Sequence, residues 1–90
     1  MAETIRIEVA YADPHRQLLR AVDIDAGSRV ADAVDASDIL AELPGFVAAG
    51  YGIFGRIVTL DAPLRDGDRV EIYRPLQIDP KQARRNRASA

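Results

Sequence analysis

The 90-residue chain contains no cysteine and no tryptophan, and it has a single histidine, His15. Without cysteine there can be no disulfide bridge, thiolate metal site, Fe–S cluster or thiol nucleophile. One histidine cannot form a histidine metal cluster, so we expect no metal centre and no other cofactor. The remaining composition, 48% hydrophobic and 29% charged, is typical of a small folded domain rather than a disordered chain.

Long apolar runs are also missing. The longest stretch without a charged residue, 43–55, has 13 residues and contains one proline and four glycines. A membrane-spanning helix needs about 20 predominantly apolar residues. The first residues carry Glu3, Arg6 and Glu8, which a signal peptide would not tolerate in its apolar stretch. We therefore expect a cytoplasmic protein with no membrane insertion.

Charge is unevenly distributed, although the formal net charge is only −2. Residues 1–78 contain 8 basic and 13 acidic residues, a balance of −5, whereas residues 79–90 contain 4 basic residues and 1 acidic residue, a balance of +3. From Lys81 onward no apolar residue is larger than alanine, so this stretch has little to bury. The sequence predicts one folded domain over 1–78 and a basic, flexible C-terminal tail over 79–90.

The first part of the chain predicts a β-hairpin. Apolar and polar residues alternate over 4–12, which is the period of a half-buried strand. Asp13-Pro14 marks a turn in which the Asp13 side chain can accept a hydrogen bond from the backbone two residues on. The returning strand spans 17–25, where Arg20 shares the parity of the apolar residues. We expect either a bulge there or an Arg20 stem that lies along apolar surface.

A helix is predicted after Gly27, with Ser28 as its N-cap and apolar residues at i, i+3 and i+4 from Val30. Either a kink or a second short helical turn capped by Ser37 follows, and the helical region ends at Pro44.

Short strands account for the remainder. Residues 51–58 are apolar but interrupted by two glycines, which favours a short, bulged strand. A turn at Asp66-Gly67 precedes the last strand, 69–73. A hairpin, a helix and further short strands, in that order, favour an α+β fold with the β-grasp layout, in which a mixed four- to five-stranded sheet packs on one main helix. By analogy with that fold, the first and last strands lie side by side and parallel in the centre.

The C-terminal part of the chain resembles the signature of the RnfH family. This resemblance rests on 64–76 (Leu-Arg-Asp-Gly-Asp-Arg-Val-Glu-Ile-Tyr-Arg-Pro-Leu) and on Asp79-Pro80-Lys81, Arg84-Arg85 and Arg87, with further likeness at Ala12, Arg16-Gln17 and 52–55. It covers nearly the whole chain. The resemblance implies a ubiquitin-like β-grasp fold, akin to the sulfur carriers of thiamin and molybdopterin synthesis, and no enzymatic activity. It also implies a protein partner: a START-like toxin for which family members are proposed antitoxins, or a component of the Rnf electron-transport complex.

One departure separates this sequence from those sulfur carriers. Their terminal Gly-Gly carries the thiocarboxylate, whereas the last glycine here is Gly67 and the chain ends Arg87-Ala88-Ser89-Ala90. We therefore do not expect sulfur-carrier chemistry.

Catalytic constellations are not apparent. His15 stands in a polar turn without a nucleophile, and the pairs Asp23/Asp25, Asp32/Asp35 and Asp66/Asp68 have the character of solvated turn and helix-surface charges. The glycine-rich segment 50–55 lacks the Gly-Lys-Ser/Thr ending of a phosphate loop. We expect no catalytic residue and no small-molecule substrate.

Two sets of residues are candidates for binding a partner. The apolar pair Ile53 and Phe54 either packs at the edge of the core or contacts a protein. The basic set is either a solvated tail or a binding element for an acidic protein face or phosphate. It consists of Arg74, Lys81, Arg84, Arg85 and Arg87. The preferred interpretation is a non-catalytic protein-interaction module. The alternative is an RNA- or ribosome-associated domain that binds through the tail.

Overall fold

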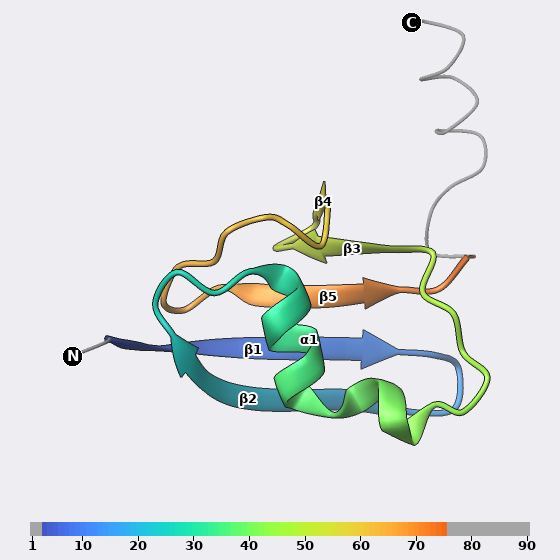
Figure 1. Ribbon diagram of the computed structural model, residues 1–90. Coiled ribbons are helices and arrows are strands. Elements are labelled where there is room, and N and C mark those ends of the chain that lie inside the picture. The colour runs from blue at the N-terminus through green and yellow to red at the C-terminus, as the bar shows by residue number, and fades with distance from the viewer. Residues whose placement is uncertain (1–2, 76–90) are drawn as a thin grey trace, which may run out of the picture.

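The computed structural model describes residues 3–75, which fold into one sheet and one helical layer (Figure 1). The elements, in chain order, are β1 (Thr4–Ala12), β2 (Gln17–Asp25), α1 (Val30–Ser37), the 3-10 helix η1 (Ile39–Glu42), β3 (Gly50–Ile53), β4 (Arg56–Val58) and β5 (Arg69–Tyr73). The predicted end of the domain at residue 78 and the predicted tail 79–90 lie outside the described residues. Neither helix within 3–75 is long and apolar enough to cross a lipid bilayer.

The five strands form a mixed sheet in the order β2-β1-β5-β3-β4, with α1 across one face (Figure 1). The first and last strands, β1 and β5, pair in parallel at the centre, from Glu8 opposite Arg69 to Tyr11 opposite Ile72. The other three pairs are antiparallel. This arrangement confirms the predicted α+β, ubiquitin-like β-grasp fold and the predicted parallel neighbours.

The core lies between α1 and the sheet face that it covers. It is formed by alternate side chains of β1 and β5, the apolar side of α1 and one residue each from η1 and two loops. Its buried apolar members are Ile5, Ile7, Val9, Tyr11, Val30, Ala33, Val34, Ile39, Leu43, Leu64, Val70 and Ile72. Since strand side chains alternate between faces, the residues between these members on β1 and β5 project from the opposite, uncovered face.

The β1–β2 pairing is continuous from Thr4 opposite Asp25 to Ala12 opposite Gln17, so the predicted bulge is absent. The alternative interpretation of Arg20 is the one confirmed. Its side chain lies on the helix side of β2 and reaches beyond the apolar residues to Glu42, where the two charged groups are 2.6 Å apart.

The predicted N-cap of α1 is wrong by one residue. Arg29, not Ser28, occupies that position, and its backbone N–H donates to the Asp32 carboxylate at 2.8 Å. The extended chain continues through Arg29 because Arg29 forms a β-bridge with Pro63, while the Ser28 carbonyl accepts the Leu64 N–H at 3.2 Å.

The helical region breaks at Asp38, which has a left-handed φ of 58°, and continues as η1. Asp38 occupies the N-cap position of η1, one residue after the predicted cap. The Ser37 hydroxyl still accepts a hydrogen bond from the Ile39 N–H at 3.3 Å. The break was thus predicted from the sequence. Asp38 occupies the cap position, but the side chain that accepts the Ile39 N–H belongs to Ser37.

The single bulged strand predicted over 51–58 is wrong. The structure has two strands there, β3 and β4, joined by a two-residue turn at Phe54 and Gly55. Both turn residues have positive φ, 48° at Phe54 and 81° at Gly55, and this permits a tight reversal where the sequence suggested only an irregular strand.

Candidate protein-binding site

Phe54 occupies a strained and exposed position at the tip of the β3–β4 hairpin. A two-residue hairpin turn with positive φ at both positions normally carries Asn-Gly or Asp-Gly, because a bulky side chain is disfavoured in the left-handed region. Phe54 nevertheless has a φ of 48°, and 64% of the residue is exposed. Phe54 thus combines a strained backbone with an aromatic ring in solvent. Neither property stabilises the fold, so a functional role is the better explanation of this residue.

Neighbouring strand β5 holds this turn in place. The Phe54 N–H donates to the Arg69 carbonyl at 3.2 Å, and the Gly55 N–H donates to the Glu71 carboxylate at 2.7 Å. Strained backbone persists where the surroundings fix it. Two successive backbone donors anchored on β5 therefore explain why this backbone conformation is kept.

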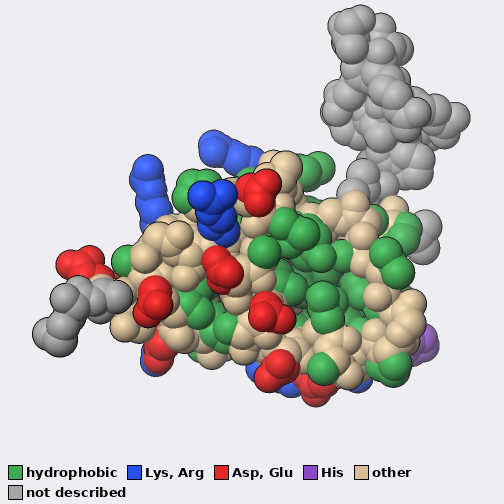
Figure 2. Space-filling view, in the orientation of Figure 1, with side chains coloured by type: hydrophobic (Ala, Val, Ile, Leu, Met, Phe, Trp, Pro, Cys, Tyr) green, Lys and Arg blue, Asp and Glu red, His purple; other side chains and the backbone are tan. Residues whose placement is uncertain are grey.

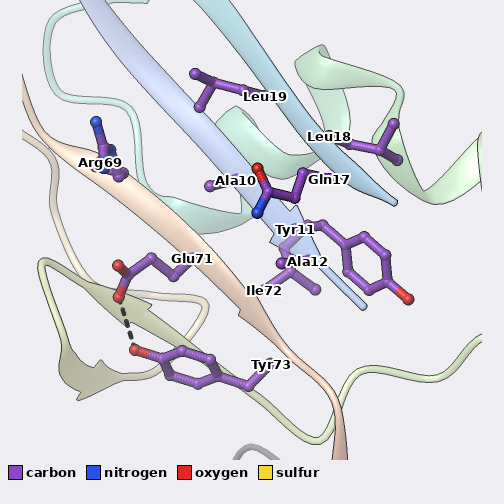
Figure 3. Close-up of a pocket in the computed structure, with 10 residues that line it drawn as sticks. All are labelled: Ala10, Tyr11, Ala12, Gln17, Leu18, Leu19, Arg69, Glu71, Ile72 and Tyr73. Atoms are coloured by element: carbon purple, nitrogen blue, oxygen red, sulfur yellow. Dashed lines mark hydrogen bonds between the residues drawn. The ribbon is translucent and has the colours of Figure 1, made fainter. Parts of the chain in front are cut away.

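The same carboxylate organises the uncovered face of the sheet. The Tyr73 hydroxyl donates to Glu71 at 2.7 Å (Figure 3). The Tyr73 ring also lies so close to Gly52 that a Cβ there would come 2.7 Å from the ring carbon Cζ. Partial burial is the main cause that raises the pKa of Tyr73 to about 12, and the hydrogen bond to Glu71 and the charge of Glu71 add to it. Glu71 thereby links the hairpin turn to the end of β5.

Beside Tyr73 the uncovered face has a shallow hollow of about 280 Å³ (Figure 3). Its floor is made by the small side chains Ala10 and Ala12 on β1, and Leu19, which is 53% exposed, forms its rim on β2. This surface was not among the sequence candidates. The signal that could have found it is a strand whose outward positions carry alanine instead of charged residues.

The structure separates the two members of the predicted apolar pair. Ile53 is half-buried and packs against the core, whereas Phe54 projects into solvent. Arg74 lies at the other end of the sheet, where its Nε donates to the Ala12 carbonyl at 2.9 Å and ties the end of β5 to the end of β1. It is not brought together with Phe54. The remaining candidates, Lys81, Arg84, Arg85 and Arg87, lie outside the described residues.

Two arginines beside Phe54 were missed by the sequence reasoning. Arg56, at the start of β4, and Arg65, in the turn before β5, both line a second hollow next to the hairpin. Figure 2 shows basic side chains projecting at the end of the molecule that carries β4, while most of the visible acidic side chains lie over the helix-bearing face. In the sequence these arginines are nine positions apart, and only the path of the chain between β4 and β5 brings them together.

Several of the carboxylates in the three predicted pairs have structural partners, including Asp32 at the start of α1, which accepts the Arg29 N–H. Asp23 pairs with Arg6 at 2.9 Å, and this hydrogen bond and charge lower the pKa of Asp23. Asp66 accepts the Arg6 N–H and Asp68 accepts the Arg65 N–H, at 2.8 and 2.9 Å. Within residues 3–75, no group of three or more His, Cys, Asp or Glu side chains could hold a metal ion.

The fold and this arrangement define a ubiquitin-like domain that carries exposed side chains at one hairpin. A family model described as "RnfH family Ubiquitin" matches residues 5–87. The chain is 53% identical over 89 residues to Protein RnfH of Burkholderia mallei, covering 97% of this chain and 81% of that protein. It is 51% identical to Protein RnfH of Halorhodospira halophila (92% and 88% covered) and 50% identical to a UPF0125 protein of Chromobacterium violaceum (100% and 92% covered).

The chain belongs to the RnfH family of ubiquitin-like proteins. The family resemblance drawn from residues 64–87 is thereby confirmed.

Proposed function

We propose that this protein is a cytoplasmic, non-catalytic protein-binding module that contacts its partner through the tip of the β3–β4 hairpin. The observation that carries the proposal is Phe54, a 64% exposed aromatic residue with a backbone φ of 48°. Aromatic residues are enriched among the side chains that contribute most binding free energy at interfaces. The turn backbone is already held by β5, so binding here needs little ordering of the main chain, which favours affinity.

The kind of partner follows from the family resemblance. A START-like toxin, with this protein as its antitoxin, is the first candidate, and a component of the Rnf electron-transport complex is the second. Either would be bound as a folded protein surface, which suits a projecting aromatic side chain better than a deep ligand pocket.

Replacing Phe54 with Asn tests this proposal because it moves stability and binding in opposite directions. Asn tolerates the left-handed conformation, so we expect the free energy of unfolding of Phe54→Asn to rise by about 1 kcal/mol. Loss of the aromatic ring should weaken binding to the purified START-like protein by more than about tenfold. Urea unfolding and isothermal titration calorimetry measure the two effects.

Val47→Asn is the matched control, because Val47 is 79% exposed in the loop between η1 and β3, away from the hairpin tip. It should leave the partner's Kd unchanged. Equal affinity of wild type and Phe54→Asn for every partner that binds would contradict the proposed interface. So would binding that Val47→Asn weakens as strongly.

The RNA- or ribosome-associated alternative depends on arginines outside residues 3–75. Binding to phosphates would fall steeply with salt and would not depend on Phe54. An affinity for RNA that is lost on removal of residues 79–90 and unchanged by Phe54→Asn would favour that alternative.

A further inference from the structure

Next to Phe54 there is a hollow of about 540 Å³ that is lined by both apolar and charged side chains. It lies at the turn end of β3 and β4, whereas α1 packs against β1, β2 and β5 and does not fill this end of the face (Figure 1). Its apolar lining comes from both strands and from the loop that follows β4. The apolar side chains that line it include Ile53, Phe54, Val58, Ala62 and Pro63.

The hollow is bordered by positive charge that no carboxylate within residues 3–75 pairs with. Elsewhere in the described chain Arg6, Arg20 and Arg69 form ion pairs with carboxylates. Arg56 and Arg65 are exposed and form no ion pair with residues 3–75. The Asp68 carboxylate also lines the hollow, but it accepts the Arg65 backbone N–H at 2.9 Å.

A third arginine lies near this end of the domain without lining the hollow. Arg29 forms no ion pair within the described residues either, and its backbone forms a β-bridge with Pro63, which does line the hollow. The arginines that lack a carboxylate or carbonyl partner on the described part of the chain thus gather at one end of a domain that is otherwise acidic. A guanidinium group is well suited to bidentate contact with a carboxylate.

We infer that the partner segment recognised here is an acidic peptide that carries one large apolar side chain. The apolar side chain packs in the hollow against Phe54, and flanking Asp or Glu residues pair with Arg56 and Arg65. This inference rests on the proposed function, since it assigns the chemistry of the partner at the same hairpin.

A nucleic acid is the weaker fit to these charges. The residues up to 78 carry a balance of −5, which repels a polyanion as a whole. Binding of single strands also relies on successive bases stacking on several aromatic side chains. Phe54 is the one aromatic residue that lines this hollow. A short acidic peptide engages the local positive charge without crossing the acidic remainder of the surface.

Titration of the full-length, ¹⁵N-labelled protein with synthetic peptides tests the inference. The probe is a short peptide of Asp and Glu residues around a central Phe. One comparison peptide has Ser in place of Phe, and another has Lys in place of the acidic residues. An oligouridine serves as the nucleic-acid comparison. We expect the acidic Phe peptide alone to saturate, with backbone amide shifts concentrated at Phe54, Gly55 and Val58.

The charge contribution is measured with Arg56→Gln/Arg65→Gln. Because neither side chain has an ion pair to lose within the described fold, this variant should remain folded. Its Kd for the acidic Phe peptide should rise about tenfold. Arg16→Gln is the control: Arg16 lies in the turn at the opposite end of the sheet, bonded to the Glu42 carbonyl at 2.7 Å, and its loss should leave the Kd unchanged.

Three results would overturn the inference: no binding of the acidic Phe peptide, equal binding of the lysine peptide or the oligouridine, or an unchanged Kd for Arg56→Gln/Arg65→Gln. The proposed function fails separately, when Phe54→Asn retains full affinity for the partner protein. A partner interaction that is sensitive to Phe54→Asn and insensitive to the double arginine variant therefore rejects the acidic segment and leaves the binding module standing.

Discussion

The β1–β2 and β3–β4 hairpins share one sheet but differ in length and burial. The strands of the first have 9 residues each, and those of the second have 4 and 3. On β1 the inward side chains of Ile7 and Val9 are fully buried, whereas on β4 the inward Val58 is only partly buried and Ile57, on the opposite face, is 65% exposed. Because burial of apolar surface is the main favourable term in folding, the first hairpin contributes far more to the stability of the domain.

The turns of the two hairpins also differ in how well they are stabilised. In the first turn Asp13 accepts backbone hydrogen bonds from His15 and Arg16 at 2.7 and 2.8 Å, and Tyr11 donates its hydroxyl to the same carboxylate at 2.8 Å. This is the usual role of Asp in a turn. The second turn has Phe54 where Asn or Asp is preferred. The domain is therefore stabilised at one hairpin and presents its strained, exposed side chain at the other.

The largest expected effect of the difference in burial comes from truncating an isoleucine in each hairpin. Ile7→Ala removes a fully buried side chain and should lower the free energy of unfolding by about 2–5 kcal/mol. Ile57→Ala removes a mostly exposed one and should change it by less than about 0.5 kcal/mol. Urea denaturation measures the free energy of unfolding of both variants. Similar losses of stability in the two would contradict the difference in burial between the hairpins.

A smaller loss is expected where the second hairpin meets β5. In Gly52→Ala the new Cβ collides with the Tyr73 ring, which must move away from Glu71, at a cost of about 1–3 kcal/mol. In a Tyr73→Leu background the collision is relieved, so the same substitution should cost clearly less. Equal costs in the two backgrounds, measured by urea denaturation, would show that the ring is not what excludes the methyl group.

The smallest effects are expected in the pH dependence of stability. Asp13 accepts hydrogen bonds from Tyr11 and from the turn backbone, and these lower its pKa. The stability that Asp13 contributes is therefore present above the unfolded pKa, near 3.8, and is lost as pH falls through the lower folded value. The pKa of Tyr73 is raised to about 12, so its contribution is present below about pH 10 and is lost as pH rises toward 12.

Urea midpoints measured against pH separate the two contributions. Asp13→Asn should flatten the acid limb of the curve, and Tyr73→Phe should flatten the alkaline limb. Part of the alkaline limb should remain in Tyr73→Phe, because burial and the bond to Asp13 also raise the pKa of Tyr11. If the acid limb is the same in wild type and Asp13→Asn, the Asp13 carboxylate does not stabilise the first hairpin.

Sequence reasoning succeeded where a pattern has one physical solution. The alternation over 4–12 predicted β1 because only a strand places every second side chain in the core. The Asp13 turn was predicted from the reach of its short carboxylate, and the structure confirms the bond to His15. The central pairing of β1 with β5 came from fold analogy, since no local pattern specifies a neighbour so distant in sequence.

The candidate site was harder to predict because its features depend on tertiary contacts. Phe54 takes a positive φ that its own preferences oppose, and hydrogen bonds to Arg69 and Glu71 on β5 hold it there. The helix N-cap shifted from Ser28 to Arg29 for the same kind of reason, a bridge to Pro63. Local propensity could not foresee either outcome, and it could not bring Arg56 next to Arg65.

The parallel pairing at the centre of the sheet has a consequence for the order in which the protein is made. Glu8 and Arg69 are 61 residues apart, and closing a loop of that length costs about 3–4 kcal/mol of chain entropy before any contact repays it. Because synthesis runs from the N-terminus, β5 is translated after β1, β2 and α1. Until the last strand arrives, β1 has one open edge. Completion of the sheet therefore waits for the strand that is translated after all the others.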